Sequence, residues 1–382
     1  MESEMESGDA AAAAENEHND AVKWTDYESQ MNSEGNLLSP MDLFREMSLL
    51  GKPVKMCAPM VRYSKLAFRT LVKSYGCDLT FTPMIVSNSF VNSVKARDSE
   101  FTTNQRDRPL IVQFAASNAK DLADAAEIIA PYADGVDLNC GCPQRWAMAE
   151  GYGAKLIKKA DLVKDMVRQT INRVTKSDFT TSIKIRIHRD IRDTVELCRR
   201  AEHTGVSWIT VHGRTTEQRG EPADHNAIRI IKESVGVPVI ANGDIKTIDD
   251  VNRVARDTGV DGVMAARGMM RNPAMYAGYT ETPYQCIQDW VDISMGLGTH
   301  FTYFHHHLIQ MLGDMYLPGS EKVNFNTLTS TSAVLDYLRL NFGIQWNPQT
   351  NFFSRNANRL GQHEFIRTNS FERMLDDCSQ DR

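Results

Sequence analysis

The segment Gly135-Val136-Asp137-Leu138-Asn139-Cys140-Gly141-Cys142-Pro143 passes from an apolar stretch into a turn marked by glycine and proline. The apolar part is typical of a buried strand, and the residues after Asn139 predict a tight turn at the strand's end. A cysteine placed in such a turn can face a ligand. Two cysteines separated by one glycine can equally be small buried side chains, which is the usual state of free cysteine. The rest of the chain must distinguish these two interpretations.

Short segments rich in Val, Ile and Thr recur between residues 54 and 265, and each precedes a segment long enough for an amphipathic helix. This alternation is typical of repeated βα units around parallel strands. We expect eight strands, at 54–57, 79–82, 110–114, 135–139, 182–187, 207–212, 237–241 and 261–265. They predict an α/β fold, a (β/α)8 TIM barrel within residues 50–275. A doubly wound open sheet is the alternative, although no GxGxxG motif follows the first strand.

Helical segments are expected between the strands, at 64–74, 119–130, 161–175, 194–204, 226–233 and 248–258. Two of them are followed directly by Gly205 and Gly259, as suits a left-handed C-terminal cap. Beyond Gly268 the spacing of apolar residues changes. Helices at 284–297, 302–315 and 332–342 predict a small all-helical domain within residues 283–344.

The composition of the 382-residue chain narrows the class of protein. Seven of its 49 acidic residues lie within the first 20 positions, which hold no Lys or Arg, and residues 1–35 are predicted to be a disordered acidic tail. No apolar stretch approaches the roughly 20 residues of a membrane span, so no membrane association is expected. The seven cysteines lack zinc-site spacing, and the three histidines at 305–307 are expected on a helix surface, so we predict no metal site.

Barrels of this kind carry their chemistry at the carboxyl ends of the strands. The side chains expected there, in strand order, are Pro59, Met60 and Val61; Gln113; Asn139 and Cys142; Lys184 and Arg186; His212; Asn242, Gly243 and Asp244; and Ala266 and Arg267. Each one alone can be a loop residue without a task. Packing does not explain all of them together at matching strand ends, so we expect a ligand site there.

Two groups in this set favour a particular kind of ligand. Backbone N–H groups near Gly243 and Gly268, with the Arg267 guanidinium, suit a phosphate after the last two strands. A plain turn followed by a helix N-cap is the alternative for residues 242–244. Lys184 can stabilise negative charge on a reduced flavin ring, and Gln113 and Asn139 offer amide hydrogen bonds to its pyrimidine edge. A purely structural Lys184 is disfavoured because an unpaired ammonium in a barrel interior is costly.

Taken together, these motifs resemble the tRNA-dihydrouridine synthases over about residues 54–345. The sequence Arg-Trp-Ala-Met-Ala-Glu-Gly-Tyr-Gly-Ala at 145–154 is similar to the eukaryotic dihydrouridine synthase 4-like branch. The resemblance implies an FMN-dependent oxidoreductase that uses NADPH or NADH to reduce the C5–C6 double bond of a uridine in the tRNA D-loop, at positions 20a and 20b. It also implies that the helical domain binds tRNA. Seven cysteines without a regular framework suit a reducing compartment, so we expect the protein in the cytoplasm, with nuclear occurrence left open.

The resemblance assigns roles to individual residues. Cys142 would be the catalytic proton donor, and Cys140 has no assigned task. Contacts to FMN would come from Pro59, Met60, Val61, Gln113, Lys184, His212, Asn242, Gly243, Asp244, Ala266 and Arg267. We assign substrate contacts to Asn139 and Arg186. The tail at 345–382 has no counterpart in the family and is predicted to be disordered.

Several questions stay open at the level of sequence. Basic residues at 155–164 and 186–200 can hold RNA phosphates or form solvated faces. A flavin dehydrogenase of a free pyrimidine would share the barrel but would not need the helical domain. A catalytically silent RNA-binding scaffold would not need Lys184, His212 and Cys142. The oligomeric state and the preference for NADPH or NADH are not determined by the sequence.

Overall fold

A computed structural model describes residues 38–346 and 348. Within these residues, eight parallel strands close a barrel: β1 (Val54–Cys57), β2 (Leu79–Phe81), β4 (Leu110–Ala115), β5 (Gly135–Cys140), β6 (Thr180–Arg186), β7 (Ile209–His212), β8 (Val239–Asn242) and β9 (Gly262–Ala265). Each pairs with the next along the chain, and β9 returns to β1. A two-residue strand, β3 (Ile85–Val86), pairs with the end of β4. The predicted TIM barrel is confirmed.

The register of the strands places the predicted site residues at matching heights. Asn139 on β5 lies opposite Lys184 on β6, and Arg186 on β6 lies opposite His212 on β7. His212 in turn lies opposite Asn242 on β8. Because these positions are at or next to the carboxyl ends of their strands, four neighbouring strands bring their polar side chains to one end of the barrel.

The predicted helices surround the barrel: α3 (Leu66–Lys73), α6 (Ala119–Ile129), α8 (Ala160–Arg173), α9 (Ile191–Thr204), α10 (His225–Ser234) and α11 (Ile248–Thr258). Gly205 and Gly259 cap α9 and α11 with φ of 99° and 68°, which confirms the expected left-handed caps. At its other end α11 begins with a capping box between Thr247 and Asp250, which satisfies backbone groups that a helix start leaves unpaired.

Several short elements were not predicted: α2 (Pro40–Leu49), α4 (Ser87–Asn92), α5 (Val94–Glu100), α7 (Arg145–Ala149), α12 (Arg267–Arg271), α15 (Ser320–Asn326), and the 3-10 helices η1 (Gly153–Lys158) and η2 (Met275–Ala277). Helix α2 begins at Ser39, whose side chain accepts the N–H of Asp42. It buries Phe44 against Trp208, with ring centroids 5.5 Å apart. Because it contributes to the core, α2 belongs with the barrel.

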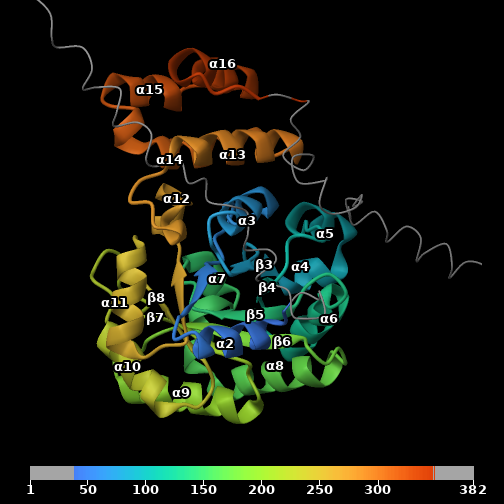
Figure 1. Cartoon of the computed structure of the whole chain (residues 1–382). Helices are drawn as coiled ribbons and strands as arrows, with labels where there is room; N and C mark the ends of the chain where they lie inside the picture. Colours follow the sequence, from blue (N-terminus) through green and yellow to red (C-terminus); the bar gives the residue numbers. More distant parts are fainter. Residues whose placement is uncertain (1–37, 347, 349–382) are drawn as a thin grey trace, which may run out of the picture. The chain divides into compact units, whose positions relative to one another are not determined.

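The C-terminal helices are α13 (Tyr284–Gly296), α14 (Phe301–Tyr316), α15 and α16 (Thr331–Phe342). Helix α14 contacts α12, α13, α15 and α16, and it lies between α12 on one side and α15 and α16 on the other (Figure 1). Helix α13 packs on α3, where the Tyr75 hydroxyl donates to the Asp289 carboxylate at 2.8 Å. The expected helical region is present, and α3 and α12 join it to the barrel.

The predicted surface position of the three histidines is wrong for two of them. His305 and His307 are only 4% and 1% exposed, because α14 has packing partners on opposite faces. His307 stacks on Phe68 of α3 with centroids 4.3 Å apart. Among the described residues no group of His, Cys, Asp and Glu is arranged to hold a metal ion. In the same part of the chain no helix is both long enough and apolar enough to cross a membrane. The predicted tail at 1–35 and nearly all of 345–382 lie outside the described residues.

Candidate active site

Cys142 sits in a turn whose backbone is held from two sides. The Asn139 side-chain oxygen Oδ1 accepts the N–H groups of Gly141 and Cys142 at 3.1 and 2.9 Å. The Cys142 carbonyl accepts the N–H of Ala154 at 2.9 Å, and a Cβ atom on Gly153 would lie 2.5 Å from that carbonyl oxygen. Cys142 is half-buried, whereas Cys140 is fully buried. Of the pair, Cys142 is the one that a ligand can reach.

A chain of buried hydrogen bonds runs from this turn into the barrel. Asn139 donates Nδ2–H to Gln113 Oε1 at 2.8 Å, and Gln113 donates Nε2–H to Asp137 Oδ2 at 2.8 Å. Ser182 donates its hydroxyl to Asp137 Oδ1 at 2.7 Å. Burial raises the pKa of Asp137 to about 6, and the two donors oppose that rise. The predicted amides of Gln113 and Asn139 therefore bond to each other and to a carboxylate.

Asp137 was missed at the sequence level because it lies within an apolar stretch. A signal was present, since Asp137 and Asn139 are two residues apart on one strand and side chains at that spacing share a face. A carboxylate on the same face as a site residue, inside a buried strand, indicates a polar interior. The structure therefore extends the candidate site downward from Asn139 to Asp137.

Lys184 links β6 to β8 across the same end of the barrel. Its Nζ donates to Asn242 Oδ1 at 2.9 Å, and Asn242 donates Nδ2–H to the Met264 carbonyl at 2.9 Å. Burial lowers the pKa of Lys184 to about 8, although the negative charge of Asp137 opposes this fall. One ammonium donor is used by Asn242, so the remaining donors of Lys184 are available to a ligand.

His212 at the end of β7 faces several cations. The Arg214 guanidinium lies 3.0 Å from His212 Nε2, and its other arm pairs with the Asp244 carboxylate. Burial, reinforced by the positive charges of Lys184, Arg186 and Arg214, lowers the pKa of His212 to about 2. His212 is therefore a neutral imidazole at physiological pH. Arg214 follows the predicted site residue His212 by two positions, and no role was predicted for it.

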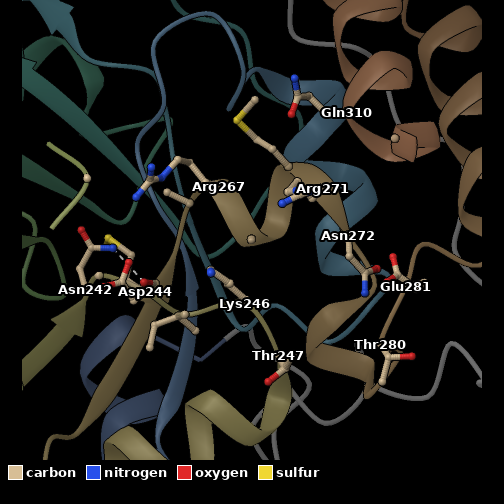
Figure 2. A pocket seen from close by; sticks show the side chains of 18 of the residues that line it. Asn242, Asp244, Lys246, Thr247, Arg267, Arg271, Asn272, Thr280, Glu281 and Gln310 are labelled. Carbon is tan, nitrogen blue, oxygen red and sulfur yellow. Dashed lines mark hydrogen bonds between the residues drawn. The ribbon is translucent and has the colours of Figure 1, made fainter. Parts of the chain in front are cut away.

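A cavity of about 760 Å³ opens beside His212, where the loops after β7, β8 and β9 face α12 and α14 (Figure 2). Its lining includes six of the predicted residues: His212, Asn242, Gly243, Asp244, Ala266 and Arg267. The loop after β8 closely approaches the start of α12, because a Cβ on Gly268 would lie 2.4 Å from the Ile245 carbonyl oxygen. The two groups predicted to hold a phosphate therefore line one cavity.

The cavity is rich in basic side chains. Figure 2 shows Lys246, Arg267 and Arg271 around it, with Asp244 and Glu281 as the acidic residues labelled there. None of the three cations forms an ion pair with another described residue, whereas Asp244 is paired with Arg214. The balance of unpaired charge in this cavity is therefore positive, as a phosphate ligand requires.

Other predicted residues lie outside this cavity. Pro59, Met60 and Val61 follow β1, where the Met60 N–H donates to the Ser64 hydroxyl at 3.0 Å and the Val61 side chain is exposed. Arg186 is buried, and its Nη1 donates to the Thr215 and Gln218 carbonyls at 2.7 and 3.1 Å. Arg186 thus holds the loop after β7.

The basic residues at 155–164, the first cluster, and those at 186–200, the second cluster, differ in whether they form ion pairs with acidic residues. In the second cluster, Arg192 pairs with Asp190 at 2.6 Å, and Arg200 pairs with Glu196 and with Asp161. These arginines therefore fit the alternative of a solvated, charge-balanced face. The lysines of the first cluster, Lys155, Lys158, Lys159 and Lys164, form no ion pair with another described residue and remain candidates for phosphate contact.

Comparison with known proteins points to one family. The family model described as Dihydrouridine synthase (Dus) matches residues 56–327. A human protein named "tRNA-dihydrouridine(20a/20b) synthase [NAD(P)+]-like" is 60% identical over 305 residues, which cover 80% of this chain and 95% of the relative. A Schizosaccharomyces pombe protein named "tRNA-dihydrouridine(20a/20b) synthase [NAD(P)+]" is 41% identical over 310 residues, covering 81% of this chain and 94% of the relative.

Proposed function

Because the chain belongs to the dihydrouridine synthase family, we propose that it reduces the C5–C6 double bond of a tRNA uridine, at positions 20a and 20b, with FMN as cofactor and NADPH or NADH as reductant. The observation that carries this proposal is the convergence of Cys142, Lys184 and His212 at the carboxyl ends of β5, β6 and β7. A barrel with a purely structural task has no need of a thiol, an ammonium and an imidazole at one end.

The residues around the cavity fit FMN. Its phosphate would be held by Arg267 and by the backbone N–H groups near Gly243 and Gly268, beside unpaired cations. Lys184 and His212 would face the polar atoms of the flavin, since both keep unused donors at the same end of the barrel. When bound, FMN supplies hydride transfer from the reduced nicotinamide to C6 of uracil.

Cys142 is assigned the proton that completes the reduction. Hydride addition at C6 leaves negative charge on C5 and on the C4 carbonyl oxygen of the uracil. The Cys142 thiol donates its proton to C5, which forms the second C–H bond and leaves a thiolate. Lys184 and Arg186 are close enough to act electrostatically on this thiolate, and both carry positive charge. Solvent then returns a proton to the thiolate.

The surface next to Cys142 suits RNA. The target base must leave its stack to reach the barrel end, and an extruded nucleotide leaves its neighbours in need of a stacking partner. Trp146 on α7 follows Cys142 by four residues, is 47% exposed, and its indole N–H is bonded to Gln144 at 2.6 Å. The indole face is left for a base, and Lys155 and Lys158 of η1 supply positive charge close by in the chain.

An anaerobic absorption experiment tests the proposal. The purified protein is expected to show an oxidised flavin spectrum, to be bleached by NADPH, and to regain its colour when tRNA lacking dihydrouridine is added. Free uridine and orotate are the matched controls and should leave the flavin reduced. Recovery with a free pyrimidine would favour the dehydrogenase alternative. A protein that stays colourless after FMN is added would favour the RNA-binding scaffold.

A further inference from the structure

Arg214 is a buried guanidinium to which the proposed reaction gives no task. It is 2% exposed, and each arm of the guanidinium has a partner. Nη1 meets His212 Nε2 at 3.0 Å, Nη2 pairs with the Asp244 carboxylate, and Nε donates to the Glu221 carbonyl. Asp244 also accepts the N–H of Ala223 at 2.7 Å. Arg214 thus joins the end of β7 to the loop after β8.

The contact with Arg214 fixes the tautomer of His212. An arginine side chain carries N–H donors and no acceptor, so Nε2 of His212 must be the unprotonated, accepting nitrogen. A neutral imidazole then carries its proton on Nδ1. The Cδ2–Nε2 edge of the ring packs toward Gly243, because a Cβ atom added to Gly243 would lie 3.1 Å from Cδ2. Nδ1 has no hydrogen-bond partner in the described part of the chain, and His212 lines the cavity.

The charged groups around His212 keep it in this form. Lys184 and Arg186 face it from β6, and Arg214 and Asp244 face it from the loops after β7 and β8. Three of these four groups are cations, so a proton on Nε2 would add a fourth positive charge and would also break the hydrogen bond from Arg214. The imidazole therefore acts as a neutral donor through Nδ1–H.

We propose that Arg214 is a positioning residue that holds His212 in the neutral Nδ1–H tautomer, so that this N–H donates a hydrogen bond to an oxygen of the bound flavin nucleotide. The inference rests on the proposed flavin function. Without Arg214, His212 is free to place its proton on Nε2, which removes the donor at Nδ1. Burial and the charges of Lys184 and Arg186 still keep the imidazole neutral, so the change is one of tautomer and not of charge.

A purely structural Arg214 would affect FMN binding independently of His212. The test is the FMN dissociation constant of the deflavinated protein between pH 5.5 and 8, from quenching of FMN fluorescence, for wild type, Arg214→Met, His212→Gln and the double variant Arg214→Met/His212→Gln. The FMN phosphate itself titrates near pH 6 in every sample, so each variant is compared with wild type at the same pH. We expect Arg214→Met to bind about tenfold more weakly at pH 8, the scale of one lost hydrogen bond to a charged group. That ratio should stay the same down to pH 5.5, because burial and the charges of Lys184 and Arg186 keep His212 neutral in the variant as well.

Arg214→Met should cause little further loss when it is added to His212→Gln, because the Nδ1 donor is already absent there. Arg214→Lys, which retains a donor, should show a smaller loss than Arg214→Met. Nitrogen-15 NMR of histidine gives an independent measure. The resonances lost in His212→Gln should show unprotonated Nε2 in wild type throughout this pH range and a protonated Nε2 in Arg214→Met. Losses of affinity from Arg214→Met and His212→Gln that simply add in the double variant, or a protonated Nε2 in wild type, would overturn the inference. Wild-type protein that binds no FMN overturns the flavin function itself, and the inference with it.

Discussion

The side-chain oxygen of Asn139 accepts the backbone N–H of Cys142 at 2.9 Å, while the amide nitrogen of the same side chain donates to Gln113 at 2.8 Å. Asn139 therefore fixes the turn that carries Cys142 against the barrel interior. We expect Asn139→Ala to reduce turnover of tRNA by about 10²-fold, the cost of displacing a reacting group by about 1 Å. Flavin content and the rate of flavin reduction by NADPH should be preserved. Asn118→Ala, at the exposed N-cap of α6, is the control. Turnover near the wild-type value would show that the turn holds its shape without Asn139.

Replacing Cys142 with alanine separates proton donation from flavin binding. The thiol is half-buried at the barrel end, whereas Cys140 is enclosed and burial raises its pKa well above the ordinary thiol value. Cys142→Ala should keep its flavin colour and its reduction by NADPH, yet lose about 10²-fold or more in dihydrouridine formation, the scale of a positioned general acid. Cys140→Ala should retain turnover. Equal losses in both variants would argue against an acid role for Cys142.

The strands and the residues at their ends were predictable because each depends on local sequence. Apolar β-branched runs locate β5 and β8 to within two residues, and polar or glycine residues directly after them locate the site. The contact between Arg214 and Asp244 joins residues 30 positions apart and arises from the pairing of β7 with β8. Only closure of the barrel brings those two loops together, so their sequence gives no comparable signal.

The histidines of α14 also depend on tertiary contacts that local sequence does not report. A run of three polar residues predicts an exposed helix face only if the helix has one packed side. Because α14 packs against partners on opposite faces, His305 and His307 are enclosed. His305 Nε2 lies 2.9 Å from the Phe325 carbonyl, and His307 Nε2 lies 3.1 Å from the Tyr63 carbonyl. The number of packed faces is a tertiary property, which local periodicity does not report.

Lys184 should make FMN binding weaken in alkaline solution. Its pKa in the ligand-free protein is about 8, chiefly because of burial. Below pH 8 the Lys184 side chain is a charged ammonium, which favours an anionic ligand. Above pH 8 it is a neutral amine, so it must take up a proton when FMN binds. We expect FMN affinity to fall by up to about tenfold between pH 7.5 and 9, as proton linkage requires. Lys184→Met should bind more weakly at pH 7.5 and lose this slope, and Lys120→Met, on the exposed face of α6, should retain it. The same slope in Lys184→Met would assign it to another group.

The ion pair of Arg69 with Asp107 should dominate local stability between α3 and the segment before β4. Both side chains are at most 1% exposed, the closest N–O distance is 2.6 Å, and Arg69 also donates to the Ser64 and Thr102 carbonyls. Asp107→Asn leaves the buried Arg69 guanidinium, and the Lys73 ammonium 3.8 Å from Asp107, without their counter-ion. We therefore expect a loss of about 3–5 kcal/mol in the free energy of unfolding, which urea denaturation measures. Arg69→Met/Asp107→Asn should lose less than the sum of the losses in Arg69→Met and Asp107→Asn, and strictly additive losses would contradict the expected coupling.

His307 should make the protein less stable in acid. Its imidazole is enclosed by Phe68, Trp290 and the Tyr63 backbone, and burial lowers its pKa to about 3 from the ordinary value of 6.5. Between these two values the unfolded chain binds a proton that the folded chain does not, so stability is retained above pH 6.5 and is lost as the pH falls. For this residue alone, a change from pH 7 to pH 5 should remove about 2 kcal/mol from the free energy of unfolding.

Between pH 7 and pH 5, His307→Phe should lose about 2 kcal/mol less than wild type, because a phenyl ring does not titrate. This difference does not depend on how stable the variant is at pH 7. His306→Gln, one residue away on the same helix, should keep the wild-type dependence. Denaturant unfolding at the two pH values distinguishes the variants, and an unchanged pH dependence in His307→Phe would show that the interface between α3 and α14 opens before His307 is protonated.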